Sequence, residues 1–362
     1  MKEAYKASLL PLRESDINVS VFINELIDAT ARLELYKEKI KSSKLANEWF
    51  LPTLQHKEAL ASSLLEGTQA TLDGVFTSQV SFDEKDKDLT EVRNYFWATK
   101  LGYEFLEREP FSIELILKLH DRIMRGNTRI SPDEIGQIRM RQNYIVKTKG
   151  SNEITFTPPK HEYVPELMDN LIEYIVSPGD DYRVLVRAAI MHAQFLTIHP
   201  FMDGNGRVGR ILIPLYLYSC AQIELPCFFI SETLERDKYK YYKSLNDIRY
   251  HGKWSEWVKF FLSTIVAQCD KFIEIVERIN SLYDRDVAKA RNLIQSAKII
   301  DLINLLYTYP VINAHIVSKY AHIPTSTANR YLTTLAQNEV LYSDERSRNR
   351  TYYYYDLLSI LR

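Results

Sequence analysis

The stretch HPFMDGNGRVGR, residues 199–210, gathers side chains that could do chemistry between two apolar segments. Gly204 and Gly206 flank Asn205, and a glycine lets backbone N–H groups face a ligand without a Cβ in the way. A helix that begins just after them would add the positive end of its dipole. The stretch therefore predicts a cradle for an anion.

Two arginines, an acid and a histidine indicate which anion the cradle suits. Arg207 and Arg210 are three residues apart and lie on one face of a helical turn, where two forked guanidinium groups suit a polyphosphate better than a carboxylate. Asp203 would repel such an anion unless a divalent cation lies between them, and Mg²⁺ held by one carboxylate and phosphate oxygens meets that need. His199 would serve as a neutral base near pH 7.

Each of these features also has an ordinary structural explanation when it stands alone. A Gly-Asn-Gly sequence is a common turn, and a histidine before a proline often ends a helix. Arginines at the start of a helix are often surface residues. Their combination in one short loop favours a functional site over these separate explanations.

The segments on either side must position this loop. Apolar residues cover most of a helix surface between 181 and 198 and again between 207 and 218, which is typical of helices buried in a bundle. Upstream, NYIVKTKG and NEITFTPP alternate in hydrophobicity and predict a β-hairpin that turns at Lys149-Gly150. Glycine is scarce, at 11 of 362 residues. We therefore expect a mostly α-helical fold with a helical-bundle core.

Three consecutive domains are predicted. Residues 1–86 form an N-terminal helical region, with one amphipathic helix between 23 and 40 and a second that starts near Pro52 and covers 56–71. The charged run SFDEKDKDLT suits a linker, and the core then occupies 87–285. The remaining residues, 290–362, form a C-terminal domain.

The C-terminal domain resembles a winged helix-turn-helix in its order of elements. Helices are expected at 296–307, 313–321 and 326–338, with a break at Pro324, and a charged hairpin follows in SDERSRNRTYYYY. From 291 to 362, eight Lys and Arg stand against five Asp and Glu, a balance of +3. Such a domain could bind DNA through its wing, or it could dock a protein or form a homodimer. The wing arginines are Arg346, Arg348 and Arg350.

Bulk composition limits the class of protein. The formal net charge of -1 gives no general reason to expect nucleic acid or a membrane as the main partner. The three cysteines, Cys220, Cys227 and Cys269, form no CxxC motif and suit reduced thiols in a cytoplasmic protein. The N-terminus lacks the apolar core of a signal peptide, and the longest apolar stretch, 211–221, is too short to span a bilayer.

The loop resembles the signature of the Fic (Fido) family, HxFx[D/E]GNGRxxR, at every fixed position. Ser62, Glu66 and Gly67 are similar to the family's inhibitory motif, [S/T]xxxE[G/N], and their place before the core resembles the class with an N-terminal inhibitory helix. The hairpin resembles the family's target-docking flap. A C-terminal winged helix is a frequent companion in bacterial members.

The resemblance implies transfer of AMP from ATP to a Ser, Thr or Tyr hydroxyl of a target protein, with release of pyrophosphate. His199 would accept the proton of the attacking hydroxyl, and Asp203 would hold Mg²⁺ or Mn²⁺ against the phosphates. Arg207 would stabilise charge on the pyrophosphate, and Phe201 would anchor the loop in the core. The side chain of Asn205, with the amides of Gly204 and Gly206, would hold phosphate oxygens.

The same resemblance assigns further residues around the nucleotide. Glu66, helped by Ser62, would reach the nucleotide site and pair with Arg210, which otherwise holds the γ-phosphate. Tyr241 and Tyr242 align with a tyrosine pair near the adenosine, and Tyr242 is the candidate ligand. Arg249 stands where members often carry Asn, a departure that bears on adenosine recognition. The flap strand that would pair with the target comprises Ile154, Thr155 and Phe156.

Several alternatives stay open. A Fic relative with Lys in place of Gly206 acts as a kinase, so the glycine favours nucleotidyl transfer. Transfer of UMP or phosphocholine, and removal of AMP, would use base-contacting or accessory residues outside the loop. A different class of function, a DNA-binding regulator that acts through residues 290–362, competes with all of these. The sequence names no target protein and does not decide between monomer and dimer.

Overall fold

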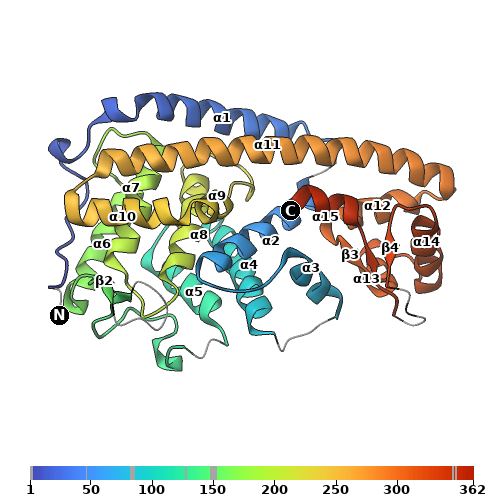
Figure 1. Cartoon of the computed structure of the whole chain (residues 1–362), viewed down its shortest axis with the longest axis horizontal. Coiled ribbons are helices and arrows are strands. Elements are labelled where there is room, and N and C mark those ends of the chain that lie inside the picture. Colours follow the sequence, from blue (N-terminus) through green and yellow to red (C-terminus); the bar gives the residue numbers. More distant parts are fainter. Residues whose placement is uncertain are drawn as a thin grey trace. The chain divides into compact units, whose positions relative to one another are not determined.

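A computed structural model describes residues 3–45, 47–81, 86–126, 129–146, 153–344, 346 and 349–362. This part of the chain is mostly helical, as expected, with two small antiparallel sheets (Figure 1). None of its helices has both the length and the apolar composition of a membrane span. The helices are α1 Ile23–Lys41, α2 Asn47–Leu65, α3 Leu72–Ser81, α4 Lys87–Leu106, α5 Ile113–Met124, α6 Val164–Val176, α7 Val184–Ile198, α8 Asn205–Ser219, α9 Ser231–Arg236, α10 Lys238–His251, α11 Trp254–Leu293, α12 Lys298–Thr308, α13 Ala314–Ala321, α14 Thr325–Gln337 and α15 Tyr355–Leu361.

The chain packs as two compact units, neither of which is continuous in sequence. One comprises residues 1–33, 61–67 and 94–268, and the other comprises 34–60, 68–93 and 269–362. These units describe packing within the chain, and the three consecutive domains expected from the sequence stay a prediction. The loop at 199–210 and all its described neighbours discussed below belong to the first unit.

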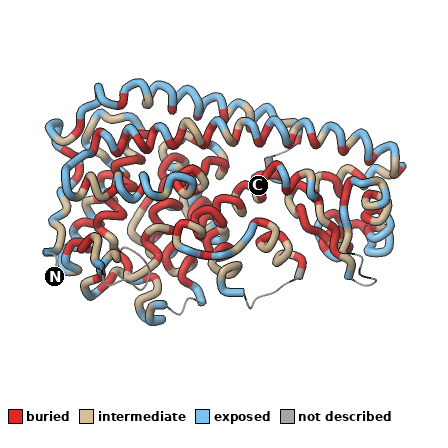
Figure 2. The backbone as a smooth tube through the Cα atoms, viewed as in Figure 1, coloured by how far each residue is buried: buried red, intermediate tan, exposed pale blue. Residues whose placement is uncertain are grey.

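Helices α7 and α8 form the core of the first unit and confirm the two buried helices predicted from the apolar pattern. Every residue of α7 from Ala188 to Ile198 is buried, and so is every residue of α8 from Arg207 to Leu217 (Figure 2). Gly209 allows the two helices to approach closely, because a Cβ there would lie 3.1 Å from the side chains of both Phe195 and Leu196. The loop between these helices is therefore held at both ends by close packing.

The second N-terminal helix differs from its prediction. It was expected to start near Pro52 and continue through Thr71, but α2 spans Asn47–Leu65 and carries Pro52 inside it. Pro52 is the sixth residue of α2, past the first turn, and it removes one backbone hydrogen bond of the helix. Gly67 follows with a φ of +94°, a conformation that glycine adopts without strain and that ends the helix. A separate helix, α3, then begins at Leu72.

A short hairpin lies upstream of the two core helices. Strand β1 (Ile145–Val146) pairs antiparallel with β2 (Ile154–Phe156), and the register shifts between Ile145 and Val146. The predicted hairpin is thereby confirmed. Its predicted turn at Lys149-Gly150 lies outside the described residues.

Residues 298–361 follow the predicted order of three helices and a hairpin. Helices α12, α13 and α14 are succeeded by strands β4 (Tyr342–Ser343) and β5 (Tyr352–Tyr353). Two elements were not predicted: β3 (Val311–Ile312), which gives a sheet of order β3-β5-β4, and the terminal helix α15. Of the wing arginines, Arg348 lies outside the described residues. The winged-helix assignment itself stays a prediction.

Candidate active site

His199 ends α7 in a left-handed conformation, with φ 54°. Its ring Nδ1 lies 3.3 Å from the Leu196 carbonyl oxygen. Burial, together with the positive charges of Arg249 and Arg139, lowers the pKa of His199 to about 4 against the opposing effects of the Leu196 carbonyl and Glu66. The imidazole is therefore neutral at pH 7, which is the state that a proton acceptor needs.

His120, on α5, holds the middle of the loop. Its ring stacks on Phe201 with centroids 3.8 Å apart and an interplanar angle of 1°. The Gly136 N–H donates to Nδ1 at 2.9 Å, so the other nitrogen, Nε2, carries the proton and donates to the Asp203 carbonyl at 3.1 Å. Burial lowers the pKa of His120 to about 4, which keeps this neutral form. Sequence reasoning missed His120, whose only signal is a polar residue on the apolar face of a helix.

The side chain of Asn205 contacts the backbone of the loop itself. Its Oδ1 accepts the Phe201 N–H at 2.9 Å, and its Nδ2 donates to the Phe201 carbonyl at 2.8 Å. The side chain is buried and clasps both polar groups of one loop residue. Asn205 thus fixes the shape of the loop, and its expected contact with phosphate oxygens stays a prediction.

Arg139 is a second residue that sequence reasoning missed. It is buried, and its Nε donates to the His199 carbonyl at 2.9 Å while its backbone N–H donates to the Pro200 carbonyl at 2.9 Å. Another of its nitrogens donates to the Pro159 carbonyl. The guanidinium group therefore stabilises the turn that carries His199.

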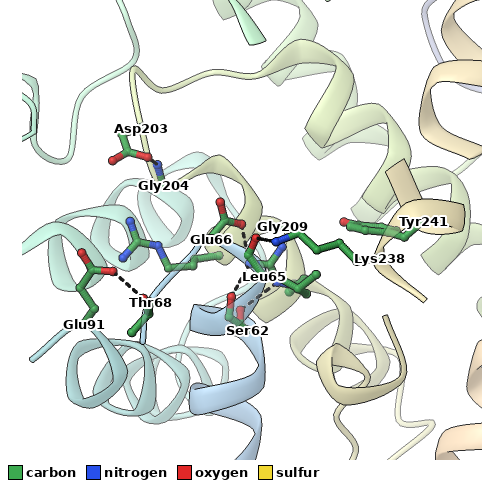
Figure 3. A network of polar contacts seen from close by, with 12 residues as sticks. Ser62, Leu65, Glu66, Thr68, Glu91, Asp203, Gly204, Gly209, Lys238 and Tyr241 are labelled. Atoms are coloured by element: carbon green, nitrogen blue, oxygen red, sulfur yellow. Dashed lines mark hydrogen bonds and ion pairs between the residues drawn. The ribbon is translucent and has the colours of Figure 1, made fainter. Parts of the chain in front are cut away.

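Ser62 and Glu66 of the inhibitory motif lie close together (Figure 3), and both contact Arg210 on α8. Arg210 Nη2 lies 2.7 Å from Glu66 Oε1 and 2.8 Å from the Ser62 carbonyl oxygen. Arg210 Nε also donates to Ser62 Oγ at 2.8 Å. The Leu65 carbonyl accepts from Lys238 Nζ at 2.6 Å. The structure thus brings Ser62 and Glu66 together with the anion-binding loop, as the sequence predicted.

The Glu66 carboxylate lies in the cradle that the loop was expected to offer an anion. A Cβ at Gly206 would collide with Glu66 Oε1 and would come within 3.0 Å of Arg210 Nη1. Burial raises the pKa of Glu66, but the positive charges of Arg210, Arg207 and Lys238 outweigh burial and lower the pKa below its usual range. The carboxylate is therefore ionised and itself acts as the anion in this cradle.

The two loop arginines are both buried, at 0% exposure for Arg207 and 1% for Arg210. Arg207 Nη2 lies 3.4 Å from the Met124 sulfur. Arg210 Nη1 is buried and has no hydrogen-bond partner among the described residues. Buried guanidinium groups are expensive unless an anion meets them. The arrangement therefore suits a ligand richer in negative charge than one carboxylate.

Asp203 fits a metal ion bound chiefly by phosphate. Its Oδ1 accepts the Gly204 N–H at 2.7 Å, and its Oδ2 lies 3.5 Å from Arg129 Nη1. Among the described residues, no cluster of three or more His, Cys, Asp or Glu side chains could hold a metal by protein ligands alone. One half-exposed carboxylate beside an anion cradle nevertheless matches Mg²⁺ that keeps most of its contacts for phosphate and water.

The tyrosine pair on α10 divides into a buried and an exposed member. The Tyr241 hydroxyl lies 2.9 Å from His192 Nε2 in the core. Tyr242 is 38% exposed, and partial burial and the negative charge of Glu66 raise its pKa. Both tyrosines are thus within electrostatic reach of Glu66 and Arg210 at the cradle, and Tyr241 is the member buried in the core.

The flap strand β2 is contacted along the edge that faces away from β1. The Thr157 carbonyl accepts the Tyr5 N–H at 2.9 Å, and the Thr155 carbonyl accepts the Tyr250 hydroxyl. The centre of the Phe156 ring lies 5.5 Å from the centre of the Tyr5 ring and 4.1 Å from the Arg249 guanidinium carbon. Arg249 therefore lies at the flap, and its bearing on adenosine recognition stays a prediction.

Two family models match the chain. The model of the Fic/DOC family matches residues 110–217, and that of the Fic/DOC family N-terminal region matches residues 23–104. The chain is 35% identical over 115 residues to protein adenylyltransferase fic-1 of Caenorhabditis elegans, a match that covers 31% of this chain and 20% of that protein. It is 28% identical over 177 residues to a probable protein adenylyltransferase of Aquifex aeolicus (strain VF5), which covers 46% of this chain and 48% of that protein.

Solved structures share the fold over a longer stretch. A Fic family protein from Desulfovibrio desulfuricans G20 superposes with a TM-score of 0.58 at 19% identity, covering 96% of this chain and 98% of that one. A Fic domain containing signaling protein from Bacteroides thetaiotaomicron gives a TM-score of 0.55 at 18% identity, covering 69% and 97%. At these identities the likeness is one of fold.

Proposed function

Since the chain belongs to the Fic/DOC family, we propose that it is a protein adenylyltransferase that transfers AMP from ATP to a Ser, Thr or Tyr hydroxyl of a target protein and is restrained by Glu66. The observation that carries the proposal is the position of the Glu66 carboxylate, ionised and seated against Gly206 and Arg210 at the start of α8. A site that already holds one anion in this way is built to hold another.

The triphosphate would occupy the cradle through backbone and guanidinium donors. The amides at the start of α8 point along the helix dipole toward the loop, and Arg207 and Arg210 add two buried positive charges. Arg210 would hold the γ-phosphate once Glu66 has left. Asn205 would act by keeping the loop in shape. Tyr242 would lie toward the nucleoside.

His199 would accept the proton of the target hydroxyl as its oxygen attacks the α-phosphorus. A P–O bond to the target forms, the bond from the α-phosphorus to the bridging oxygen breaks, and pyrophosphate leaves. The low pKa of His199 keeps the imidazole neutral, and Arg139 fixes the turn from which it acts. Arg207 would stabilise the charge that develops on the pyrophosphate.

Asp203 would hold Mg²⁺ or Mn²⁺, which when bound neutralises phosphate charge and orients the triphosphate. The loop keeps the Asp203 carboxylate half-exposed, since His120 holds the backbone carbonyl of the same residue. The flap strand β2 would receive an extended segment of the target. That segment would have to displace the Tyr250 hydroxyl, which donates to the Thr155 carbonyl.

The ion pair between Glu66 and Arg210 accounts for restraint. With Arg210 engaged by a carboxylate, a triphosphate cannot settle with its α-phosphate in line for attack. Ser62 reinforces the restraint, because its hydroxyl and carbonyl oxygens both accept from the same guanidinium group.

Labelled ATP tests the proposal. Purified protein carrying Glu66→Gly is incubated with a cell lysate and ATP labelled at either the α- or the γ-phosphate. Label in protein from the α-position supports AMP transfer, and label from the γ-position would indicate a kinase. Labelled UTP or CDP-choline in place of ATP distinguishes transfer of UMP or phosphocholine. No label from any donor would contradict transferase activity.

A further inference from the structure

Arg249, near the end of α10, contacts both parts of the molecule that a target hydroxyl must meet. Its Nη2 donates to the Leu196 carbonyl at 3.0 Å and its Nε donates to Thr197 Oγ1 at 3.4 Å. These acceptors lie three and two residues before His199. The flat face of the same guanidinium group lies 4.1 Å from the centre of the Phe156 ring in β2. One side chain therefore joins the His199 turn to the flap strand.

Charge balance argues that this position is not incidental. Nη1 donates to Asn246 Oδ1 at 3.2 Å, so each nitrogen of the group donates to an uncharged acceptor. Among the described residues, no carboxylate forms an ion pair with Arg249. Burial lowers the pKa of Arg249 to about 10. A partly buried cation without a counter-charge is stabilised here by the negative end of the α7 dipole and by an aromatic face.

We propose that Arg249 is a positioning residue that holds the His199 turn and the flap strand in one fixed geometry, so that a segment docked on β2 presents its hydroxyl to His199. The inference rests on the proposed role of His199 as proton acceptor. It adds a residue outside the loop motif to the machinery. A lysine could retain the charge at this position but not the fork that spans Leu196 and Thr197.

Electrostatics gives this role a measurable signature at His199. Arg249 on α10 and Arg139 in the loop before β1 both lower the pKa of His199, and Glu66 after α2 opposes them. Loss of the Arg249 charge, and entry of water into its place, both favour the protonated imidazole. A residue that only packed the flap against α10 would not shift the titration of His199.

The experiment compares Arg249→Met and Arg249→Lys with the parent, all in the Glu66→Gly background. Lys243→Met is the matched control, since it removes an exposed cation of the same helix that pairs with Asp247. Histidine ring signals are followed by NMR between about pH 3.5 and 8, with His199→Gln to assign the signal of His199. Rates of self-modification from α-labelled ATP, and ATP affinity by calorimetry, are measured in parallel.

For Arg249→Met we expect the His199 titration to move up by about one pH unit or more, and the rate of self-modification to fall about 10- to 100-fold, because small misplacements of reacting groups have effects of that size. ATP affinity should stay within about twofold. In Arg249→Lys the His199 titration should stay close to its low parent value, and the rate of self-modification should still fall. Lys243→Met should match the parent in every measurement.

The outcomes separate this inference from the proposed function. If no variant, parent included, transfers label from ATP, the adenylyltransferase proposal fails, while the NMR titration still decides whether Arg249 sets the state of His199. If Arg249→Met keeps the parent titration and rate, the positioning role is overturned. Should Arg249→Met fail to fold by circular dichroism, Arg249→Lys decides the matter, because unchanged rate with that variant overturns the role of the fork.

Discussion

Glu66 Oε1 lies 2.7 Å from Arg210 Nη2, and this pair joins the residue after α2 to the first turns of the helix that begins the anion cradle. Arg210 is fully buried, whereas the Glu66 side chain keeps 27% of its surface exposed. The guanidinium group is thus fixed, and the carboxylate is the partner that can be replaced. An arriving triphosphate would compete for the same donors.

Glu66→Gly should raise self-modification and target modification several-fold or more. The change removes the carboxylate from the cradle and frees Arg210 for the γ-phosphate, while Ser62 still positions the guanidinium group. Incorporation of label from α-labelled ATP into the purified protein measures the effect at saturating ATP.

Arg210→Ala is the control for this prediction. It should be inactive with or without Glu66→Gly, because it removes the phosphate contact itself. An unchanged rate for Glu66→Gly, with the fold intact by circular dichroism, would show that the contact between Glu66 and Arg210 is packing and not restraint.

His199→Gln should lower the rate of transfer by about 10²- to 10⁴-fold and leave ATP affinity within a few-fold, since the imidazole meets the hydroxyl and not the triphosphate. Because the pKa of His199 is lowered to about 4, the rate of the unsubstituted enzyme should hold from pH 7 down to about 5 and fall below that. A pH series of initial rates measures both. Transfer by His199→Gln at the parent rate would remove the histidine from the mechanism.

Asp203→Ala should be inactive at metal concentrations that saturate the parent and should regain part of its rate as Mg²⁺ or Mn²⁺ is raised. The carboxylate is the one acid in the loop, so its loss weakens metal binding without removing the phosphate cradle. Rates titrated against metal give the comparison. Activity of the parent that survives excess EDTA would reject a metal altogether.

Four histidines whose pKa values are lowered by burial should make the protein less stable as the pH falls. Burial lowers the pKa values of His56 and His192 to about 3, and those of His120 and His199 to about 4. An unfolded imidazole takes up its proton near pH 6.5, so between about pH 6.5 and 4 the unfolded state binds more protons and stability declines. Each histidine contributes up to roughly 1.4 kcal/mol per pH unit there.

Urea unfolding at pH 7, 6 and 5 tests this dependence. His192→Gln should flatten the slope, because His192 is buried against Tyr241 and Gly209. The exposed His251→Gln should leave the slope as it is. Equal slopes for both variants would show that the buried histidines do not govern acid sensitivity.

The loop and its two helices could be predicted because their signals are local: an apolar surface on both helices, and glycines, arginines and an acid at fixed spacing. The hydrogen bonds between the Asn205 side chain and the Phe201 backbone could not be predicted, because they depend on the folded path of the loop. Arg139 and Arg249 donate to backbone carbonyls that are distant in sequence. Every residue has a backbone carbonyl, so the sequence does not show which of them accepts a hydrogen bond.

Helix ends and short strands show the same limit. The second N-terminal helix was expected to continue through Thr71, but the positive φ of Gly67 ends α2 at Leu65. Strand β3 has two residues, too few for an alternating pattern to register, and it forms because β5 lies beside it. Contacts across the chain decide such elements, whereas periodicity decides the long helices.

The C-terminal region yields a last prediction, that it binds duplex DNA. Helix α14 buries one face through Ala328, Tyr331 and Leu332 and leaves Asn329 and Arg330 exposed, as a helix that enters a groove would. The exposed residues at its start, Thr325 and Ser326, are also of the kind that contact phosphate.

The protein should therefore shift duplex DNA with an affinity that falls steeply as salt is raised. The triple variant Arg330→Ala, Arg346→Ala, Arg350→Ala should weaken binding and lower the salt slope by up to about three, since each lost phosphate contact lowers it by about one. Replacing three basic residues of the other unit, Lys118, Arg125 and Lys243, by Ala removes the same charge elsewhere and should have little effect. Equal losses of affinity in the two variants would mean that DNA binding depends only on the net charge of the protein. No shift even at low salt would favour a protein-docking or dimer-forming role for residues 290–362.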